Sequence, residues 1–201
     1  MTRRPWLFAL GIAAFGAAVI PPFDDASARL FSIHMLQHMV MLLVAAPLLA
    51  ASGFVPRRSG LQWVVTVGLL QAVAIWAWHM PVLYDAAMHH DALHILEHLS
   101  FVIAAALFWA VVLDASIDPL KRVGLTFGTM LQSSALGALL AFAPSPLYQW
   151  HIEHTPVAYD VLAQQQAAGA IMWIPAGVAY LVVMLALLWR VLTSYGAVEQ
   201  P

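Results

Sequence analysis

The sequence from Ala92 to Leu113 is ALHILEHLSFVIAAALFWAVVL, and Glu97 is the only Asp, Glu, Lys or Arg in these 22 residues. About 20 apolar residues in a helix are enough to cross the ~30 Å hydrocarbon core of a bilayer. Strands of an outer-membrane barrel instead alternate in polarity over ~10 residues. The segment is therefore predicted to be a transmembrane helix. Four more segments have a similar length and character: Leu30–Ala51, Leu61–Trp78, Val123–Ala143 and Ala167–Val191.

The composition of the whole chain agrees with a membrane protein. Hydrophobic residues make up 63% of the 201 residues and charged residues 9%, whereas a soluble domain carries about 25% charged residues. We predict an all-α fold, a single transmembrane helical bundle over residues 1–201. The net charge of −2 gives no basic field for nucleic acid. The absence of Cys excludes disulfides, zinc–thiolate sites and thiol nucleophiles.

The first apolar run, Trp6–Ile20, is short for a span. A helix of this length covers about 22 Å at ~1.5 Å per residue. Arg3 and Arg4 precede the run, and Ala26-Ser27-Ala28 follows it in the pattern of a signal-peptide cleavage site. Residues 1–28 are thus either a first helix, which gives six helices, or a removed signal peptide, which leaves five. Residues 193–201 are predicted to form a short tail.

The basic residues and the histidines are predicted to lie on opposite sides of the membrane. Seven of the eight basic residues fall on one side, with Arg29 as the exception: Arg3, Arg4, Arg57, Arg58, Lys121, Arg122 and Arg190. Because cytoplasmic loops are enriched in Lys and Arg, we expect both termini to be cytoplasmic if the first helix is retained. All nine histidines then fall on the outer side: His34, His38, His79, His89, His90, His94, His98, His151 and His154.

Two spans begin with the same motif. His34-Met35-Leu36-Gln37-His38 and His94-Ile95-Leu96-Glu97-His98 both have the form H-x-x-(Q/E)-H. Side chains four apart on a helix share one face, so each pair can present two imidazoles to one metal ion. Gln37 and Glu97 are then candidates for side chains that hydrogen-bond to the metal-binding imidazoles and fix their orientation. The two helices run in the same direction, so the pairs should lie at a similar depth, with His79 of a third span at that level.

Further residues on the outer side could take part in such a site. Imidazole suits Cu, Zn, Fe and Ni, and thioether ligands would favour Cu(I). Asp160 and Gln165 enter the last span at the level of the histidine pairs and could hydrogen-bond to ligands or water, although simple solvation at the interface is the more ordinary explanation. For His89, His151 and His154 we expect only ordinary hydrogen bonding at the membrane interface. Five methionines also lie near the outer side: Met35, Met39, Met41, Met80 and Met88.

Three other chemistries use similar histidine patterns. His94-x-x-Glu97-His98 matches the H-x-x-E-H zinc peptidase pattern, but a third ligand is not evident. A membrane b-type cytochrome takes one His from each of two facing helices, and His38 and His98 could be such axial ligands. Membrane di-iron hydroxylases contain histidine boxes that His89-His90 and His94 superficially resemble, but those boxes face the cytoplasm, contrary to the topology predicted here.

Proline and glycine mark special positions within the spans. Pro47 and Pro175 lie inside predicted helices, where each would remove a backbone hydrogen bond and bend the helix. Gly169 lies among alanines on a small-residue surface that is suited to close helix contact. The segment 145–150 is predicted to form an amphipathic lid or belt at the outer surface.

Several of these motifs together resemble the multi-span CtaG-type cytochrome c oxidase assembly factors. The resemblance covers about Leu30 to Leu188, most of the chain. It is carried by five motifs: His34-x-x-x-His38 with Pro47-Leu48; Trp76-x-Trp78-His79-x-Pro81-x-Leu83-Tyr84-x-x-Ala87; His94-x-x-Glu97-His98-x-x-Phe101 with Phe108-Trp109; Ser145-Pro146-Leu147-Tyr148; and Gln165-x-x-x-Gly169-x-x-Met172-Trp173-Ile174-Pro175. In two respects the chain departs from the family pattern: Gln164 stands where an acidic residue is often found, and the chain is compact.

The resemblance implies a non-enzymatic role in maturing a haem–copper oxidase in the bacterial plasma membrane. Copper is the implied metal, with zinc and haem as alternatives. The candidate ligands are His34, His38, His79, His94 and His98. The implied partners are oxidase subunits and a periplasmic or extracellular copper donor. Two alternatives remain open: a b-type haem electron-transfer protein, and a metal-free scaffold for oxidase assembly.

Overall fold

The computed structural model describes residues 3–196, and this part of the chain contains helices and no β-strand. The helical elements are α1 (Pro5–Ala18), α2 (Phe23–Arg29), α3 (Phe31–Val40), the π-helical turn η1 (Met41–Ala45), α4 (Ala46–Ala51), α5 (Leu61–Trp78), α6 (Pro81–His89), α7 (Asp91–Val112), α8 (Pro119–Ala141), α9 (Gln149–His154) and α10 (Val161–Gly196). Five segments are long and apolar enough to cross a membrane, and the pair α1 and α2, bent by 47°, would make a sixth. The predicted all-α fold with five or six spans is confirmed.

The predicted spans agree closely with the observed helices. α3, η1 and α4 form one span over Phe31–Ala51, and α5 has the predicted bounds. α8 begins a turn earlier than predicted, because Asp118 caps it. The Asp118 carboxylate accepts hydrogen bonds from the backbone N–H groups of Leu120 and Lys121 at 2.9 and 3.1 Å, which satisfies donors that an uncapped helix end leaves free.

α10 is longer than predicted at both ends. It begins at Val161 rather than Ala167, because the Asp160 carboxylate accepts a hydrogen bond from the backbone N–H of Ala163 at 2.6 Å and caps the first turn. The helix continues through Pro175, where the sequence predicts a bend, and ends at Gly196. The expected tail at 193–201 is therefore helical as far as Gly196, and its remainder lies outside the described residues.

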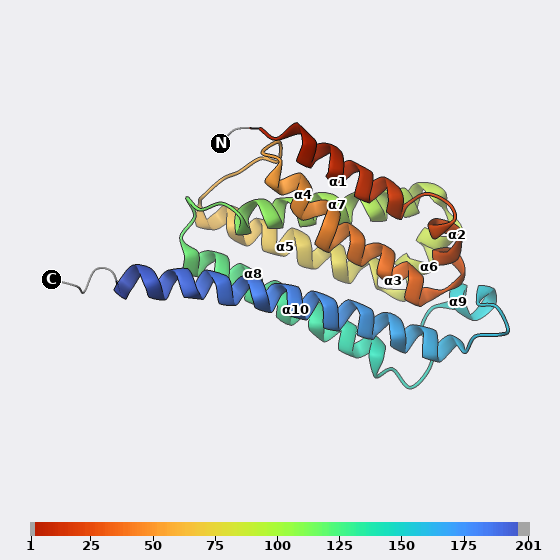
Figure 1. The fold of residues 1–201 in the computed structure, drawn as a ribbon. Helices are drawn as coiled ribbons and strands as arrows, with labels where there is room; N and C mark the ends of the chain where they lie inside the picture. The colour runs from red at the N-terminus through yellow and green to blue at the C-terminus, as the bar shows by residue number, and fades with distance from the viewer. Residues whose placement is uncertain (1–2, 197–201) are drawn as a thin grey trace.

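The long helices lie side by side along one axis (Figure 1). α10 packs on α8 and α3, α7 packs on α4 and α5, and α1 packs on α4 and η1. The two termini lie at one end of the bundle, and the short helices α2, α6 and α9 lie at the other (Figure 1). α3 directly follows α2 and α7 directly follows α6. The first turns of α3 and α7, which carry the histidine pairs, therefore share the end of the bundle opposite the termini.

α8 and α10 approach closely at two glycines. A Cβ atom at Gly169 would collide with the backbone N of Ala141 and the backbone O of Gly137. A Cβ atom at Gly137 would lie 2.9 Å from Cβ of Trp173. The prediction of a close helix contact at Gly169 is thus confirmed, and the contact depends on the missing side chains.

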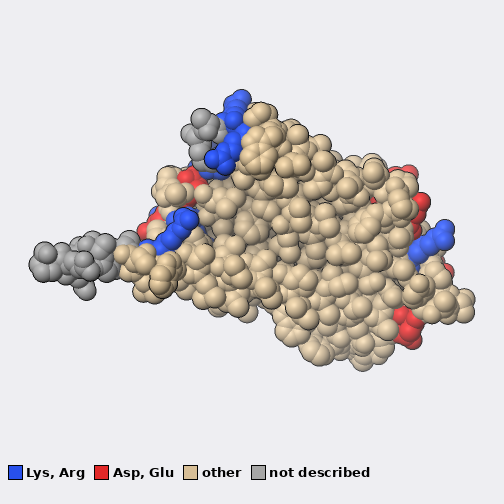
Figure 2. All heavy atoms as spheres, viewed as in Figure 1, with Lys and Arg blue, Asp and Glu red and all other residues tan. Residues whose placement is uncertain are grey.

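Charged side chains lie toward the two ends of the bundle on the face shown in Figure 2. On the face shown in Figure 2, Lys and Arg gather mainly at the end that holds the termini, and a broad band without charge separates this end from the other. Large apolar side chains such as Leu69 and Val73 of α5 are about 60% exposed on the outside of the bundle. An uncharged, apolar belt of this kind is what contact with lipid requires.

Candidate metal centre

Two pairs of histidines meet between α3 and α7. The ring centroids of His34 and His38 on α3 are 4.3 Å apart, and those of His94 and His98 on α7 are 4.2 Å apart, as expected for residues four apart on one helix. Across the helices, the His34 and His94 rings are 5.8 Å apart and the His38 and His98 rings 5.5 Å. The four residues form one group, which we call the histidine cluster.

The histidine cluster is largely buried among protein side chains. Three of its members expose at most 5% of their surface: His34, His38 and His98. His94 is half-buried. It lines a cavity of about 230 Å³ together with His98 and Asp24. The cluster is therefore most accessible from the side of His94.

Glu97 lies against the cluster. On α7 it lies three residues after His94 and directly before His98, and its side chain is fully buried. Its Oε1 atom lies 3.7 Å from Nε2 of His38 and 4.0 Å from Nε2 of His34. The backbone carbonyl of Glu97 accepts a hydrogen bond from the Ser100 hydroxyl at 2.8 Å, and that hydroxyl in turn accepts one from the Trp78 indole. Glu97 thus reaches from α7 toward both imidazoles of α3.

Most polar side-chain atoms at this place have no hydrogen-bond partner among the described residues. This is the case for both ring nitrogens of His34 and of His38, for both carboxyl oxygens of Glu97, and for Nε2 of His94 and of His98. A buried polar group without a partner costs free energy of order 1–3 kcal/mol in proteins, and ionisable groups inside a membrane are costly and usually functional. So many unpaired atoms at one point are typical of a site that binds a ligand.

The arrangement fits a metal ion. His34, His94 and Glu97 form one group whose ligand atoms all lie within 4.8 Å of one another, and His38, Glu97 and His98 form a second. Zn–N and Zn–O bonds are about 2.0–2.2 Å long, so two ligand atoms of one such ion lie at most about 4.4 Å apart. The distances from Glu97 to the imidazoles of α3 satisfy this limit, and small side-chain movements would complete each group.

His79 lies beside the cluster but belongs to neither group. Its ring centroid is 6.0 Å from that of His38, and its Nδ1 atom is hydrogen-bonded to the carbonyl of Ile75 at 2.7 Å. The Tyr148 hydroxyl donates to the His79 carbonyl at 2.9 Å. Nε2 of His79 is buried and has no partner among the described residues. The third span therefore brings an imidazole to the level of the pairs, as predicted, at their edge.

The structure corrects the predicted role of Gln37. Its amide nitrogen donates to the carbonyl of Ala18 at 2.8 Å and to the carboxylate of Asp24 at 2.9 Å, and not to a histidine ring. The physical reason is that Gln37 faces α1 and α2, whereas the histidines of α3 face α7. Gln37 therefore fastens α1 and α2 to α3.

Asp160 and Gln165 bond to backbone groups and not to the histidine cluster. Asp160 is exposed and caps α10. The side-chain carbonyl of Gln165 accepts a hydrogen bond from the backbone N–H of Leu147 at 2.7 Å, and its amide donates to the carbonyl of Ser145 at 3.3 Å. Both side chains are satisfied by nearby backbone, so neither orients an imidazole of the cluster. Gln165 instead holds the loop before α9.

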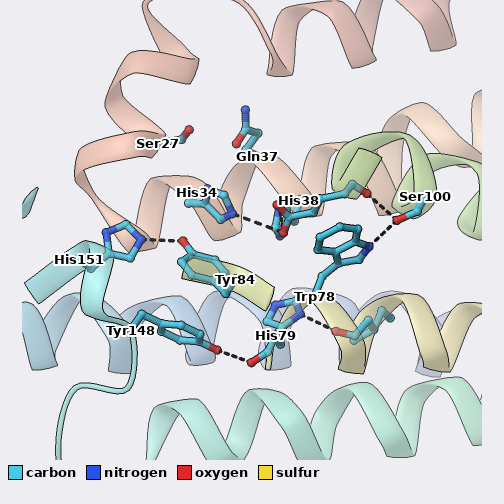
Figure 3. A network of polar contacts seen from close by, with 12 residues as sticks. Ser27, His34, Gln37, His38, Trp78, His79, Tyr84, Ser100, Tyr148 and His151 are labelled. Carbon is cyan, nitrogen blue, oxygen red and sulfur yellow. Dashed lines mark hydrogen bonds and ion pairs between the residues drawn. The ribbon is translucent and has the colours of Figure 1, made fainter. Parts of the chain in front are cut away.

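The burial and the contacts of His151 differ from those that the sequence predicts. We expected hydrogen bonding at the interface, but the side chain is 2% exposed, and its Nε2 atom is hydrogen-bonded to the Tyr84 hydroxyl at 2.6 Å. Its ring stacks on Phe31 at 4.8 Å and lies 6.5 Å from the ring of His34. Figure 3 shows His151, Tyr84 and His34 next to one another, with Tyr148 and His79 beyond them.

Three hydrogen bonds, in addition to the one between His151 and Tyr84, hold α9 over this end of the bundle. The Asp85 carboxylate accepts from the backbone N–H groups of Gln149 and Trp150 at 3.2 and 3.0 Å. The Trp150 indole donates to the carbonyl of Ala28 at 2.8 Å. The segment predicted to be a lid or belt therefore covers the α3 side of the cluster. The signal that could have revealed it is the combination of the apolar Leu147-Tyr148 with Trp150 directly before His151.

The other outer residues lie apart from the cluster or in the apolar core. His89, His90 and His154 are exposed. Nδ1 of His89 is hydrogen-bonded to the carbonyl of Asp85, and the His154 ring stacks on Trp150. Among the methionines, Met80 is 56% exposed. The other four are buried and belong to the hydrophobic core: Met35, Met39, Met41 and Met88.

Fold and site together define a multi-pass helical membrane protein in which two neighbouring spans enclose buried histidine and glutamate side chains that could hold a metal ion. Residues 1–194 match the cytochrome c oxidase caa3 assembly factor family (Caa3_CtaG). The chain belongs to this family of assembly factors, as the sequence motifs predicted. No curated protein and no solved structure matches the chain.

Proposed function

We propose that this assembly factor binds copper in the histidine cluster and aids its delivery to the oxidase. The observation that carries the proposal is the set of buried ring nitrogens and carboxyl oxygens that have no hydrogen-bond partner among the described residues. Imidazole is a suitable ligand for copper. In this proposal the ligands are His34, His38, His94 and His98. His79 lies at the edge of the cluster, where it is available as a further ligand.

The cluster is suited to transfer more than to storage. It lacks thiolates, because the chain has no Cys, and thiolates are the softest and strongest protein ligands for cuprous ions. His94 is half-buried and lines a cavity of about 230 Å³, which gives an incoming ion a path to the ligands. A site with moderate affinity and an accessible ligand can release its ion to a partner.

The histidine cluster faces the outer side of the plasma membrane in this proposal. The basic residues that predict the cytoplasmic side lie near the termini, in the α4–α5 connection and in the first turn of α8, away from α2, α6 and α9. The cluster lies within the first turns of α3 and α7, near the opposite end. Copper would then be received from an outer donor and passed to an oxidase subunit on the same side. Both termini are cytoplasmic in this arrangement.

The direct test is the metal content of the full-length protein purified in detergent. We expect copper in the wild-type protein and a lower copper content in the double variant His34→Ala, His94→Ala. The matched control is His89→Ala, His90→Ala, which removes two exposed outer histidines and should leave the copper content unchanged. In cells that depend on this chain for oxidase assembly, the first variant should lose oxidase activity and the control should keep it.

Three outcomes would overturn the proposal. A Soret band in the visible spectrum would identify a haem protein. Oxidase activity that survives in the His34→Ala, His94→Ala variant would indicate a metal-free scaffold. Equal copper loss in the variant and the control would show that the metal binds elsewhere.

A further inference from the structure

Glu97 belongs to both candidate metal groups. One group consists of His34, His94 and Glu97, and the other of His38, Glu97 and His98. Each group takes one imidazole from α3 and one from α7. The two imidazoles of the same helix fall into different groups, so the four rings are divided crosswise between the helices. The described residues therefore offer two neighbouring ligand sets that share a single carboxylate.

The carboxylate is free to serve both sets. Both of its oxygens are buried, and neither has a hydrogen-bond partner among the described residues. Its Oε1 atom lies within 4.0 Å of an imidazole from each set, Nε2 of His34 and Nε2 of His38. An ionised carboxylate has two oxygens with about four lone-pair sites, which is enough to bind two ions at once.

The buried charge decides which ions suit this place. Neutral imidazoles add no charge, so two divalent ions and one carboxylate would leave a net charge of +3 inside the membrane, whereas two cuprous ions leave +1. Each uncompensated charge in a low-dielectric interior costs at least several kcal/mol. Without Glu97 the two cuprous ions would leave +2. The carboxylate is therefore needed most when both sets are filled.

We propose that Glu97 bridges two cuprous ions, one held by His34 and His94 and the other by His38 and His98. This inference rests on the proposed copper-binding function and adds its stoichiometry, its oxidation state and the role of Glu97 as a ligand. Each ion has three protein ligands. An open fourth position is the arrangement that lets a metal site exchange its outer ligand, as a copper donor or acceptor would require.

The test is the number of copper ions per chain. The full-length protein in detergent is loaded anaerobically with Cu⁺, freed of excess metal, and assayed for copper and protein. We expect two ions per wild-type chain and one ion per chain in each of two double variants: His34→Ala, His94→Ala and His38→Ala, His98→Ala. The exposed pair His89→Ala, His90→Ala should keep two.

Glu97→Gln tests the bridge itself. The amide keeps the size of the side chain but removes its charge, so the copper content should fall from two ions to one. The X-ray absorption spectrum of the loaded wild-type protein should show scattering between two copper ions less than about 4 Å apart, which is the metal–metal distance typical of two-metal sites. That scattering should vanish in Glu97→Gln. The X-ray absorption result on the wild-type chain does not depend on whether any variant folds.

The outcomes separate this inference from the function on which it rests. One copper ion per wild-type chain, without copper–copper scattering, overturns the two-ion site and leaves copper binding intact. No copper in the wild-type chain overturns both. Loss of all copper in each of the two double variants would indicate one ion shared by the four imidazoles, and it would likewise overturn the division into two sets.

Discussion

The indole Nε1–H of Trp109 donates a hydrogen bond at 2.8 Å to the backbone carbonyl of Leu42, from α7 to the π-helical turn η1. In a regular α-helix that carbonyl would accept from the N–H of Ala46. Here the N–H of Ala46 is bonded to the carbonyl of Met41, and the next residue, Pro47, has no N–H to offer. The indole thus satisfies a carbonyl that the proline leaves without a partner. Where the sequence predicts a bend, the structure has a π-helical turn and a side-chain donor.

Trp109→Phe should destabilise the protein. The phenyl ring keeps most of the buried apolar surface but removes the donor, so the loss should be close to that of one hydrogen bond inside a membrane protein, about 0.6–1.7 kcal/mol. Unfolding of the purified protein in detergent measures it. Trp189→Phe is the matched control, because Trp189 is 69% exposed on the outside of α10. Equal stability of the two variants would show that the indole hydrogen bond contributes nothing.

Gly169→Ala should separate α8 from α10. The added methyl group would collide with backbone atoms of Ala141 and Gly137, which cannot turn aside as a side chain can. Forcing extra atoms into a packed contact typically costs about 1–3 kcal/mol. On the same helix, Gly177→Ala meets only Ser134 Oγ at 4.0 Å and should be tolerated. If both variants unfold at the same temperature, the glycine contact is not what brings the helices together.

The spans and the histidine pairs could be predicted because each depends on a local rule. A span needs about 20 apolar residues, and α5 was therefore predicted with its observed bounds, Leu61–Trp78. The i, i+4 spacing places His34 over His38 and His94 over His98 whatever the helices pack against. Because the two helices run in the same direction, the two pairs are also expected to lie at a similar depth. The cross-helix ring distances below 6 Å confirm this expectation.

The roles of Gln37 and Glu97 could not be predicted, because they depend on which neighbour each helix faces. Both residues occupy the fourth position of the same five-residue motif. On α7 this position points toward the imidazoles of α3, whereas on α3 it points toward Ala18 and Asp24. The position of His151 has the same origin, since it is set by contacts with residues more than 60 positions away, such as Tyr84. Local spacing contains no information on such packing.

Gln37→Leu should separate the structural role of this residue from a role in metal binding. The leucine removes the two hydrogen bonds that tie α3 to Ala18 and Asp24, and leaves a buried carbonyl of α1 without a donor. We expect a stability loss of about 1–3 kcal/mol with an unchanged copper content per folded chain. Elemental analysis of the folded fraction measures the second quantity. Copper loss as large as in the His34→Ala, His94→Ala variant would restore Gln37 to the metal site.

The docking of α9 should weaken in mild acid because of His151. Burial, together with the smaller effect of the neighbouring His154, lowers the pKa of the His151 imidazole to about 4. When α9 is undocked the pKa returns to about 6.5, so the undocked segment binds a proton that the docked segment does not. The free energy that favours docking of α9 therefore has its full value above pH ~7 and is smaller by about 1.4 kcal/mol at pH ~5.5.

Amide hydrogen exchange of Gln149–His154 measures this docking, once the rates are corrected for the intrinsic effect of pH. Protection should fall about tenfold between pH ~7.5 and ~5.5, as 1.4 kcal/mol implies. His151→Asn cannot be protonated in this range, so in that variant the protection should be lower at pH ~7.5 and nearly constant across the two pH values. His154→Asn is the control, because His154 is exposed and its loss should leave most of the pH dependence in place. A pH dependence that persists undiminished in His151→Asn would assign it to another group.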